Sequence, residues 1–228
     1  MKYMGSKAQI ANSLLPILVK NRVHGQWYVE PFAGGMNMIC RVAGNRIAND
    51  VHLPLIRMWE KLVAGWVPEK LSKEEYYDIR GNRSKYPPHI VGWAGFSCSY
   101  AGKYFDGYAN ENNNRDYQDE SLANIMAQVQ FMRGVVFKCG SYDELEIPPN
   151  SIVYCDPPYL GARGYFREFD HKKFWNWVRD KSNEGHEVFV SEYYAPSDFE
   201  CLWQKEQTST LSRAKVVSTE KLFKLKGT

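Results

Sequence analysis

The tetrapeptide Asp156-Pro157-Pro158-Tyr159 combines side chains that could bind an amine-bearing ring. It follows the apolar run 151–155, which predicts a buried strand, and two consecutive prolines cannot continue the hydrogen-bonded ladder of that strand. The Asp156 carboxylate can accept a hydrogen bond from an exocyclic amine, a proline-turn carbonyl can accept the second amine hydrogen, and the Tyr159 ring can stack on the base. These residues alone favour neither a nucleobase site nor a simple turn that ends a strand.

A glycine turn earlier in the chain indicates where a cofactor could bind. Glu30-Pro31-Phe32-Ala33-Gly34-Gly35 follows a predicted strand at 27–29 and precedes a predicted helix at about 36–43, and Asp50 ends a second predicted strand at 46–49. This order is typical of the first half of a doubly wound nucleotide-binding sheet, where the acid binds ribose hydroxyls. The full G-x-G-x-x-G that lets backbone approach a pyrophosphate is absent. The pattern therefore suits an adenosine cofactor without phosphates, such as S-adenosylmethionine.

The segment Lys2-Tyr3-Met4-Gly5-Ser6-Lys7 offers a ring, a glycine and a cation in one place. Ser6 is a plausible N-cap for a helix that continues to Leu18, and Pro16 should kink or shorten that helix. Taken alone, the segment is more typical of an ordinary solvated N-terminus than of a ligand site.

Residues 65–119 differ in character from the segments on either side. Cations, aromatic rings, glycines and amides are interleaved there. Such residues can contact phosphates, hydrogen-bond to base edges and insert between the base pairs of a duplex. A small ordinary subdomain with a flexible loop is the alternative, and the balance of charges does not decide between them. Because long insertions in small α/β domains usually serve a function, we expect residues 65–119 to be a target-recognition subdomain inserted between 1–64 and 120–228.

The remaining segments predict further elements of the same sheet. We expect helices at 53–63, from about 122 to 132 and around 174–178, and strands at 135–139 and 187–191. Closing strands with a basic edge that includes Arg213 are expected within 205–226, and a loop at 160–166 carries one cation, Arg163.

Four polar segments each follow a predicted strand: Glu30 to Gly35, Asp50, Ser141-Tyr142 and Asp156 to Tyr159. Ligands of doubly wound sheets bind beyond the carboxyl ends of the strands, at the point where the strand order reverses. We therefore expect all four segments to project into one site.

Composition excludes several other classes of protein. With 228 residues, 44% hydrophobic content and a net charge of +3, the chain can bury a large core, and its charge permits nucleic-acid binding without requiring it. The five cysteines form no CxxC pair, which predicts a reducing compartment with neither disulfides nor a zinc cluster. No apolar stretch is long enough for a membrane span. We expect a cytoplasmic, stand-alone monomer without a metal.

Together these motifs resemble the Dam-like family of DNA adenine-N6 methyltransferases, in which the cofactor motif precedes the recognition insert and Asp-Pro-Pro-Tyr follows it. The resemblance covers nearly the whole chain and rests on residues 2–7, 29–35, 49–50 and 154–159, with later motifs at 191–193 and 219–223. It implies a doubly wound, mostly parallel, seven-stranded Rossmann-like α/β sheet with an inserted DNA-recognition subdomain. It also implies transfer of the S-adenosylmethionine methyl group to N6 of an adenine flipped out of double-stranded DNA, with GATC the family's commonest target, in a bacterial cell or a phage-infected host.

The resemblance also implies roles for individual residues. Asp156 and the Pro157 carbonyl would accept the two N6 hydrogens, Pro158 would complete the turn, and Tyr159 would stack on the base. Ser141 stands where the family commonly has an acid that contacts the cofactor's adenine amine. The implied cofactor-binding residues are Tyr3, Gly5, Lys7, Glu30, Pro31, Phe32, Ala33, Gly34, Gly35, Asp50, Ser141, Tyr142 and Asp156, and the candidate DNA-binding residues are Lys2, Lys103 and Arg115.

Three alternatives remain open. The first is an amine methyltransferase that acts on cytosine N4, RNA adenine or a protein amide; the family tends to have Ser at the place of Asp156 for cytosine and Asn for amides, so Asp156 favours adenine. The second is a dinucleotide-dependent oxidoreductase, which the missing pyrophosphate glycines disfavour. The third is a catalytically silent DNA-binding module, which the intact Asp-Pro-Pro-Tyr disfavours.

Overall fold

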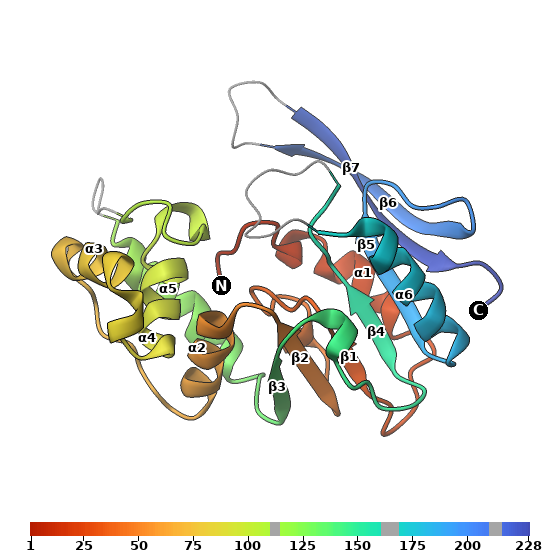
Figure 1. Ribbon diagram of the computed structural model, residues 1–228, viewed down its shortest axis with the longest axis horizontal. Helices are drawn as coiled ribbons and strands as arrows, with labels where there is room; N and C mark the ends of the chain where they lie inside the picture. The colour runs from red at the N-terminus through yellow and green to blue at the C-terminus, as the bar shows by residue number, and fades with distance from the viewer. Residues whose placement is uncertain (110–114, 161–168, 210–215) are drawn as a thin grey trace.

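The computed structural model describes residues 1–109, 115–160, 169–209 and 216–228. Within these ranges the chain forms a seven-stranded sheet of order β3-β2-β1-β4-β5-β7-β6 (Figure 1). Neighbouring strands from β3 to β5 are parallel, and β7 pairs antiparallel with both β5 and β6. The predicted Rossmann-like architecture is thus confirmed. The strands are β1 Tyr28–Glu30, β2 Arg46–Asp50, β3 Val135–Cys139, β4 Ile152–Cys155, β5 Glu187–Glu192, β6 Phe199–Ser209 and β7 Val216–Leu225.

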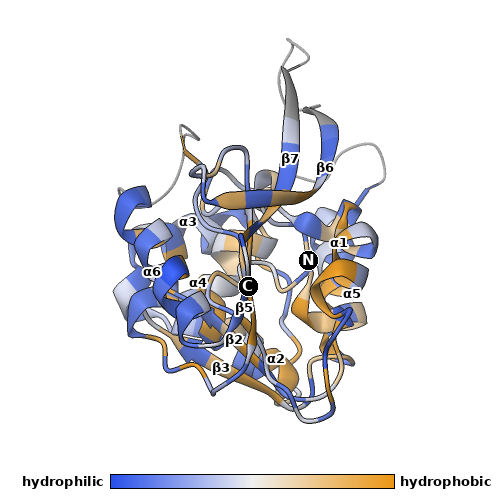
Figure 2. Ribbon diagram, turned by 90° about the vertical axis from the view of Figure 1, so that its right-hand side faces the viewer, coloured by the Kyte–Doolittle hydropathy of each residue, from blue (hydrophilic) through white to orange (hydrophobic). Residues whose placement is uncertain are grey.

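Helices cover both faces of the sheet. They are α1 Ala11–Leu18, α2 Leu53–Val63, α3 Lys73–Gly81, α4 Pro88–Gly92, α5 Tyr117–Val129 and α6 His171–Asn183. In Figure 2, α1 is largely hydrophobic, whereas α6 is mostly hydrophilic and keeps only a stripe of buried aromatic and aliphatic residues. Among the described residues, no helix is both long and apolar enough to cross a membrane.

Alternate residues of each central strand enter two separate cores, because side chains on a strand point to opposite faces. Ile152 and Tyr154 of β4 pack in one cluster with α1, α2 and α5, while Val153 and Cys155 pack in the other with α6. Burial on both faces explains why the run before Asp156 is continuously apolar.

The predicted helix at about 36–43 was wrong. The structure has only a short 3-10 helix, Ile39–Arg41, because Met36 adopts a left-handed backbone (φ 57°) that an α-helix cannot contain. The helix predicted from Ser6 is divided into two parts. Ser6 caps a short 3-10 turn, Lys7–Gln9, and α1 begins at Ala11. Pro16 lies inside α1, which ends two residues later.

Residues 65–109 form a helical layer beside the sheet, at the left of Figure 1. Helix α4 lies so close to α2 that a Cβ on Gly92 would come within 2.2 Å of the Pro54 carbonyl oxygen. A buried π-helical segment, Trp93–Ser97, follows α4 and joins its core to that of the sheet. Our division of the chain at 64 and 120 stays a prediction. Residues 110–114, residues 161–168 with Arg163, and Arg213 lie outside the described residues.

Candidate active site at the carboxyl ends of the strands

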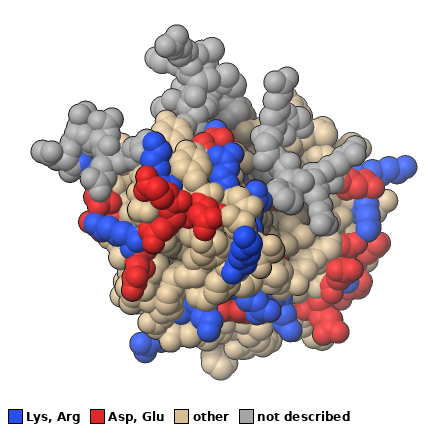
Figure 3. All heavy atoms as spheres, turned by 60° about the vertical axis from the view of Figure 1, so that its left-hand side comes forward, with Lys and Arg blue, Asp and Glu red and all other residues tan. Residues whose placement is uncertain are grey.

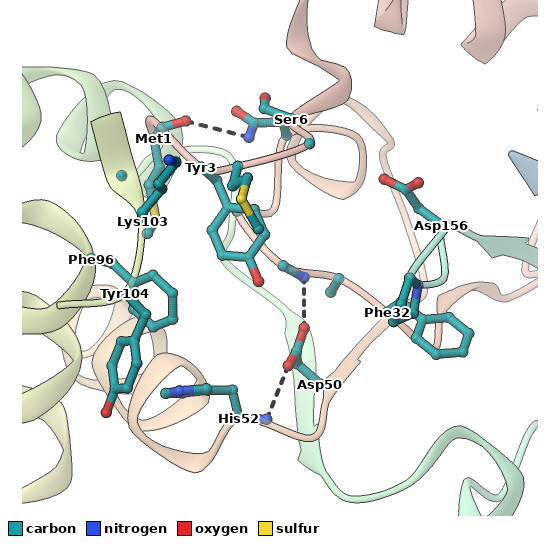
Figure 4. Close-up of a pocket in the computed structure, with 18 of the residues that line it drawn as sticks. Met1, Tyr3, Ser6, Phe32, Asp50, His52, Phe96, Lys103, Tyr104 and Asp156 are labelled. Carbon is teal, nitrogen blue, oxygen red and sulfur yellow. Dashed lines mark hydrogen bonds between the residues drawn. The ribbon is translucent and has the colours of Figure 1, made fainter. Parts of the chain in front are cut away.

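A cavity of about 2070 Å³ opens between the carboxyl ends of the central strands and the helical layer. Its volume exceeds the roughly 300–1,000 Å³ of a typical ligand pocket, so it has room for a cofactor and a nucleotide together. All predicted site residues line it except Pro157 and Arg115. The four polar segments therefore converge as the topology predicts. Figure 4 shows Tyr3, Asp50 and Asp156 around this space, from three different elements.

The glycine turn after β1 is shaped by the first residues of the chain. A Cβ on Gly34 would lie 2.7 Å from the Tyr3 ring, and one on Gly35 would lie 2.7 Å from the Tyr3 Cβ. Gly34 also has a left-handed backbone, with φ 46°. Both glycines are thus needed so that Tyr3 can lie directly against the turn. The side chain of Gln128 on α5 closes the same corner, because it accepts a hydrogen bond from the Met1 amine and donates to the Gly35 carbonyl.

Asp50 connects the end of β2 to the glycine turn. Its carboxylate accepts hydrogen bonds from the backbone N–H of Gly34 at 3.0 Å and of His52 at 2.9 Å (Figure 4). Burial raises the pKa of Asp50, and these two backbone donors oppose the rise. The acid therefore lies at the cavity wall in a fixed orientation, as a ribose-binding acid would.

Asp156, whose side chain is 21% exposed, forms an ion pair with the buried Lys7 near the start of the chain. Lys7 Nζ lies 2.7 Å from Asp156 Oδ1 and 3.5 Å from Glu220 Oε1, and the Lys7 side chain is only 8% exposed. The same ammonium donates to the Gly5 carbonyl. Burial raises the pKa of Asp156, and Lys7 opposes this rise. The opening motif and Asp-Pro-Pro-Tyr are thus one electrostatic unit, which neither segment alone indicated.

Tyr159 is largely buried at the cavity wall. Its hydroxyl donates to Glu220, its ring meets the Tyr193 ring edge-on at 4.7 Å, and Lys7 Nζ lies 4.7 Å from its ring centroid. The next residue is also anchored, because Leu160 N–H donates to the buried Glu192 carboxylate at 2.8 Å. Stacking of a base on Tyr159 stays a prediction.

An aromatic cluster forms the part of the wall near Ser141. The Tyr142 ring packs against Phe32 at 5.2 Å and against Phe169 at 5.8 Å. The Ser141 hydroxyl donates to Asp143, whose carboxylate also pairs with Lys173 at 2.5 Å. Lys173 holds the pKa of Asp143 below its usual range, so this acid stays ionised.

Several cavity residues were missed by the sequence reasoning. Asp143 was detectable as an acid four residues after the end of β3 and two positions beyond Ser141. His52 follows Asp50 closely, and its ring contacts Phe96 and Tyr104 at 5.0 and 4.3 Å between centroids. Burial lowers the pKa of His52 to about 4, so it is neutral at physiological pH. Among the described residues, no cluster of three or more His, Cys, Asp or Glu could hold a metal ion.

Two of the candidate DNA-binding cations meet at one acid on the rim. Lys2 Nζ lies 3.2 Å and Arg115 Nε 2.8 Å from the Glu120 carboxylate, and both cations lie over the Tyr117 ring. Lys103, the third candidate, lies 3.4 Å from Asp106. Figure 3 shows basic and acidic side chains interspersed on this side of the molecule rather than gathered into a basic face.

Comparisons with known proteins agree with the family indicated by the motifs. The family of D12 class N6 adenine-specific DNA methyltransferases matches residues 3–87 and 94–219. The retron Ec67 DNA adenine methylase of Escherichia coli is 27% identical, over 84% of this chain and 75% of its own length. The type II methyltransferase M.FokI of Planomicrobium okeanokoites is 22% identical over 78% of this chain, which spans only 31% of that relative.

Solved structures give a weaker likeness. A putative RNA methyltransferase from Pyrococcus horikoshii is 11% identical with a TM-score of 0.43, and the match covers 95% of this chain and 84% of that one. This similarity carries no functional argument. The family match, by contrast, includes the glycine turn, Asp50 and the whole of Asp-Pro-Pro-Tyr. The chain therefore belongs to the family of D12 class N6 adenine-specific DNA methyltransferases.

Proposed function

We propose that this protein transfers the methyl group of S-adenosylmethionine to the N6 amine of an adenine in double-stranded DNA. The observation that carries the proposal is the buried Lys7–Asp156 pair at the head of Asp-Pro-Pro-Tyr, in a cavity large enough for two ligands. Membership of the family supports the substrate class. Under this proposal residues 65–119 recognise the target, and GATC is the first sequence to test.

The cavity lining fits the cofactor. S-adenosylmethionine is cationic at its sulfonium and at its α-ammonium, and the wall offers a buried acid, Glu30, whose Oε1 has no hydrogen-bond partner among the described residues. Burial raises the pKa of Glu30 well above its ordinary value, a penalty that a bound cation would relieve. Phe32 and Tyr142 offer apolar surface for a flat ring, and Asp50 offers acceptors for the ribose hydroxyls. When bound, the cofactor supplies an activated methyl group.

The side chains around Asp156 would prepare the amine. An aromatic amine is a poor nucleophile because its lone pair is delocalised into the ring. Asp156 at the cavity wall would accept one N6 hydrogen, which helps to localise the lone pair toward the methyl group. The resemblance assigns the other hydrogen to the Pro157 carbonyl, although Pro157 is buried and does not line the cavity. The nitrogen–carbon bond forms as the sulfur–carbon bond breaks, and the amine then loses one proton, for which Asp156 is the nearest acceptor. Fixed orientation of this kind is worth roughly 7–11 kcal/mol of the barrier.

The base must leave the duplex to reach Asp156, because the carboxylate lies at a cavity wall. Unstacking costs a few kcal/mol, and stacking on Tyr159 would offset part of it. The Tyr159 ring is already fixed by three contacts, so little side-chain entropy would be lost when the base arrives.

The test is methyl transfer from tritium-labelled S-adenosylmethionine to unmethylated duplex DNA of mixed sequence, followed by separation of the nucleosides. We expect label in N6-methyladenine from the wild type, and a loss of several orders of magnitude in Asp156→Asn, which keeps the shape of the side chain. The matched control is Asp198→Asn, an acid paired with Arg179 that does not line the cavity. Label in N4-methylcytosine would refute the adenine assignment, and no label in the DNA would refute the proposed reaction.

A further inference from the structure

Glu220 of β7 contacts Tyr159 directly and is linked to Asp156 through Lys7. It accepts the hydrogen bond of the Tyr159 hydroxyl, and its Oε1 lies 3.5 Å from Lys7 Nζ, which in turn lies 2.7 Å from Asp156. Glu220 is only 6% exposed. It is the residue directly after the end of the family match, which stops at residue 219.

A buried carboxylate at this position needs its two partners. An unpaired acid would be expensive to bury, whereas Lys7 and the Tyr159 hydroxyl together satisfy Glu220. Burial raises the pKa of Glu220, Lys7 opposes the rise, and repulsion from Asp156 adds to it. The groups that face Glu220 are thus Lys7 from the 3-10 turn, Asp156 and Tyr159 after β4, and Tyr154 within β4.

Because one ammonium is shared by two acids, Glu220 influences how strongly Lys7 holds Asp156. Without the Glu220 charge, Lys7 would interact with Asp156 alone and would draw electron density and hydrogen-bonding capacity away from the incoming amine. Without its hydrogen bond to Glu220, the Tyr159 ring would lose one of the contacts that fix its plane, beside those with Tyr193 and the Lys7 ammonium.

We propose that Glu220 is a positioning residue for methyl transfer. It fixes the plane of the Tyr159 ring and weakens the ion pair between Lys7 and Asp156, because it shares the Lys7 ammonium. Glu220 does not touch the reacting atoms itself. This inference rests on the proposed function, since the step that it tunes is the attack of the adenine amine.

The experiment compares Glu220→Gln, Tyr159→Phe and the double variant in single-turnover methylation of duplex DNA, with KM measured for DNA and for S-adenosylmethionine. Gln keeps an acceptor for the Tyr159 hydroxyl but loses the charge, and Phe keeps the ring but loses the hydroxyl. The matched control is Glu187→Gln, which removes an acid paired with Lys224 at 3.7 Å between β5 and β7, outside the cavity lining.

We expect Glu220→Gln to lower the methylation rate constant about 10- to 100-fold and each KM to change less than about threefold. A merely structural role would lower the melting temperature and the active fraction without this split between the rate constant and KM. Because Glu220→Gln removes the charge shared with Lys7 and Tyr159→Phe removes the hydroxyl hydrogen bond, the two losses should roughly multiply in the double variant. Glu187→Gln should keep the wild-type rate constant.

A rate constant for Glu220→Gln within about twofold of wild type would overturn the inference. If Glu220→Gln does not fold, Tyr159→Phe decides alone, and a wild-type rate constant in that variant overturns it. A wild type that methylates adenine while these variants are unimpaired refutes this inference only. A wild type that transfers no methyl group to DNA refutes the proposed function, and this inference fails with it.

Discussion

Replacement of Lys7 by methionine should show how much the fold depends on one buried ammonium. Lys7 is the ion-pair partner of Asp156 at 2.7 Å and of Glu220 at 3.5 Å. Removing one partner of a buried ion pair leaves uncompensated charge, which destabilises a fold by roughly 3–5 kcal/mol. For a chain of 228 residues, each kcal/mol lowers Tm by about 2–4 °C, so we expect Lys7→Met to melt roughly 6–20 °C below wild type at pH 8.

The pH dependence of this deficit follows from the direction of the pKa shifts. Burial raises the pKa of Asp156 and of Glu220, and Lys7 opposes both rises. Without Lys7 the two folded-state pKa values rise further above those of the unfolded chain. An acid with a raised folded pKa destabilises the fold at high pH, and this penalty declines as pH falls through the folded pKa and the group is protonated. The Tm deficit should therefore shrink from pH 8 to pH 5.

The assay is thermal unfolding followed by circular dichroism at pH 8, 6 and 5, with Lys224→Met as the control. Lys224 pairs with the half-exposed Glu187 at 3.7 Å, so its loss should change stability by about 1 kcal/mol or less. Equal deficits for the Lys7 and Lys224 variants at pH 8, or a Lys7 deficit that grows toward acid pH, would refute the reasoning.

Three further predictions concern other residues of the cavity and its rim. Glu30→Gln should raise Tm at pH 8 but not at pH 4, because burial raises the pKa of Glu30 and the charged form is costly to bury; a lower Tm at pH 8 would contradict this effect of burial. The same substitution should weaken S-adenosylmethionine binding about tenfold, as measured by calorimetry. The His52 ring should titrate with a midpoint of about 4 by NMR, and a midpoint above 6 would contradict a pKa lowered by burial. If Arg115 contacts a DNA phosphate, Arg115→Gln should reduce the slope of log affinity against log salt concentration by about 0.9. The control is Arg57→Gln, which removes a cation from an exposed pair with Glu60 and should leave the slope unchanged.

The sheet and the convergence of its polar segments could be predicted because both follow from local patterns. A buried parallel strand such as β4 is a continuous apolar run, and the polar segments that follow β1, β2, β3 and β4 line the cavity. The strand before Asp156 and the strand before Asp50 were both placed within one residue of their observed bounds. The error at 36–43 is instructive, because the left-handed conformation of Met36 is not evident from its residue type.

Contacts between distant segments could not be predicted in this way. That the Tyr159 hydroxyl donates to Glu220 depends on how β7 lies in the sheet, and no periodicity encodes which buried acid meets which ring. Similarly, the two glycines of the turn suggested room for a ligand, whereas the structure shows the Tyr3 ring against them. Residue types therefore indicated the edge of the sheet at which the polar segments meet. Which side chains contact one another at that edge depends on the tertiary structure.

The first seven residues unite these distant parts. Tyr3 lies against the turn after β1, Lys7 bridges the acids that follow β4 and lie on β7, and Lys2 pairs with Glu120 at the start of α5. One short segment thus contacts the proposed cofactor side, the proposed base side and the rim of the cavity. Because a packed segment of this kind cannot shift at one contact without straining the others, a ligand that displaces Tyr3 or Lys7 must also alter the surroundings of Asp156. Through this segment, binding of the cofactor would alter the affinity for the flipped-out base, and binding of the base would alter the affinity for the cofactor.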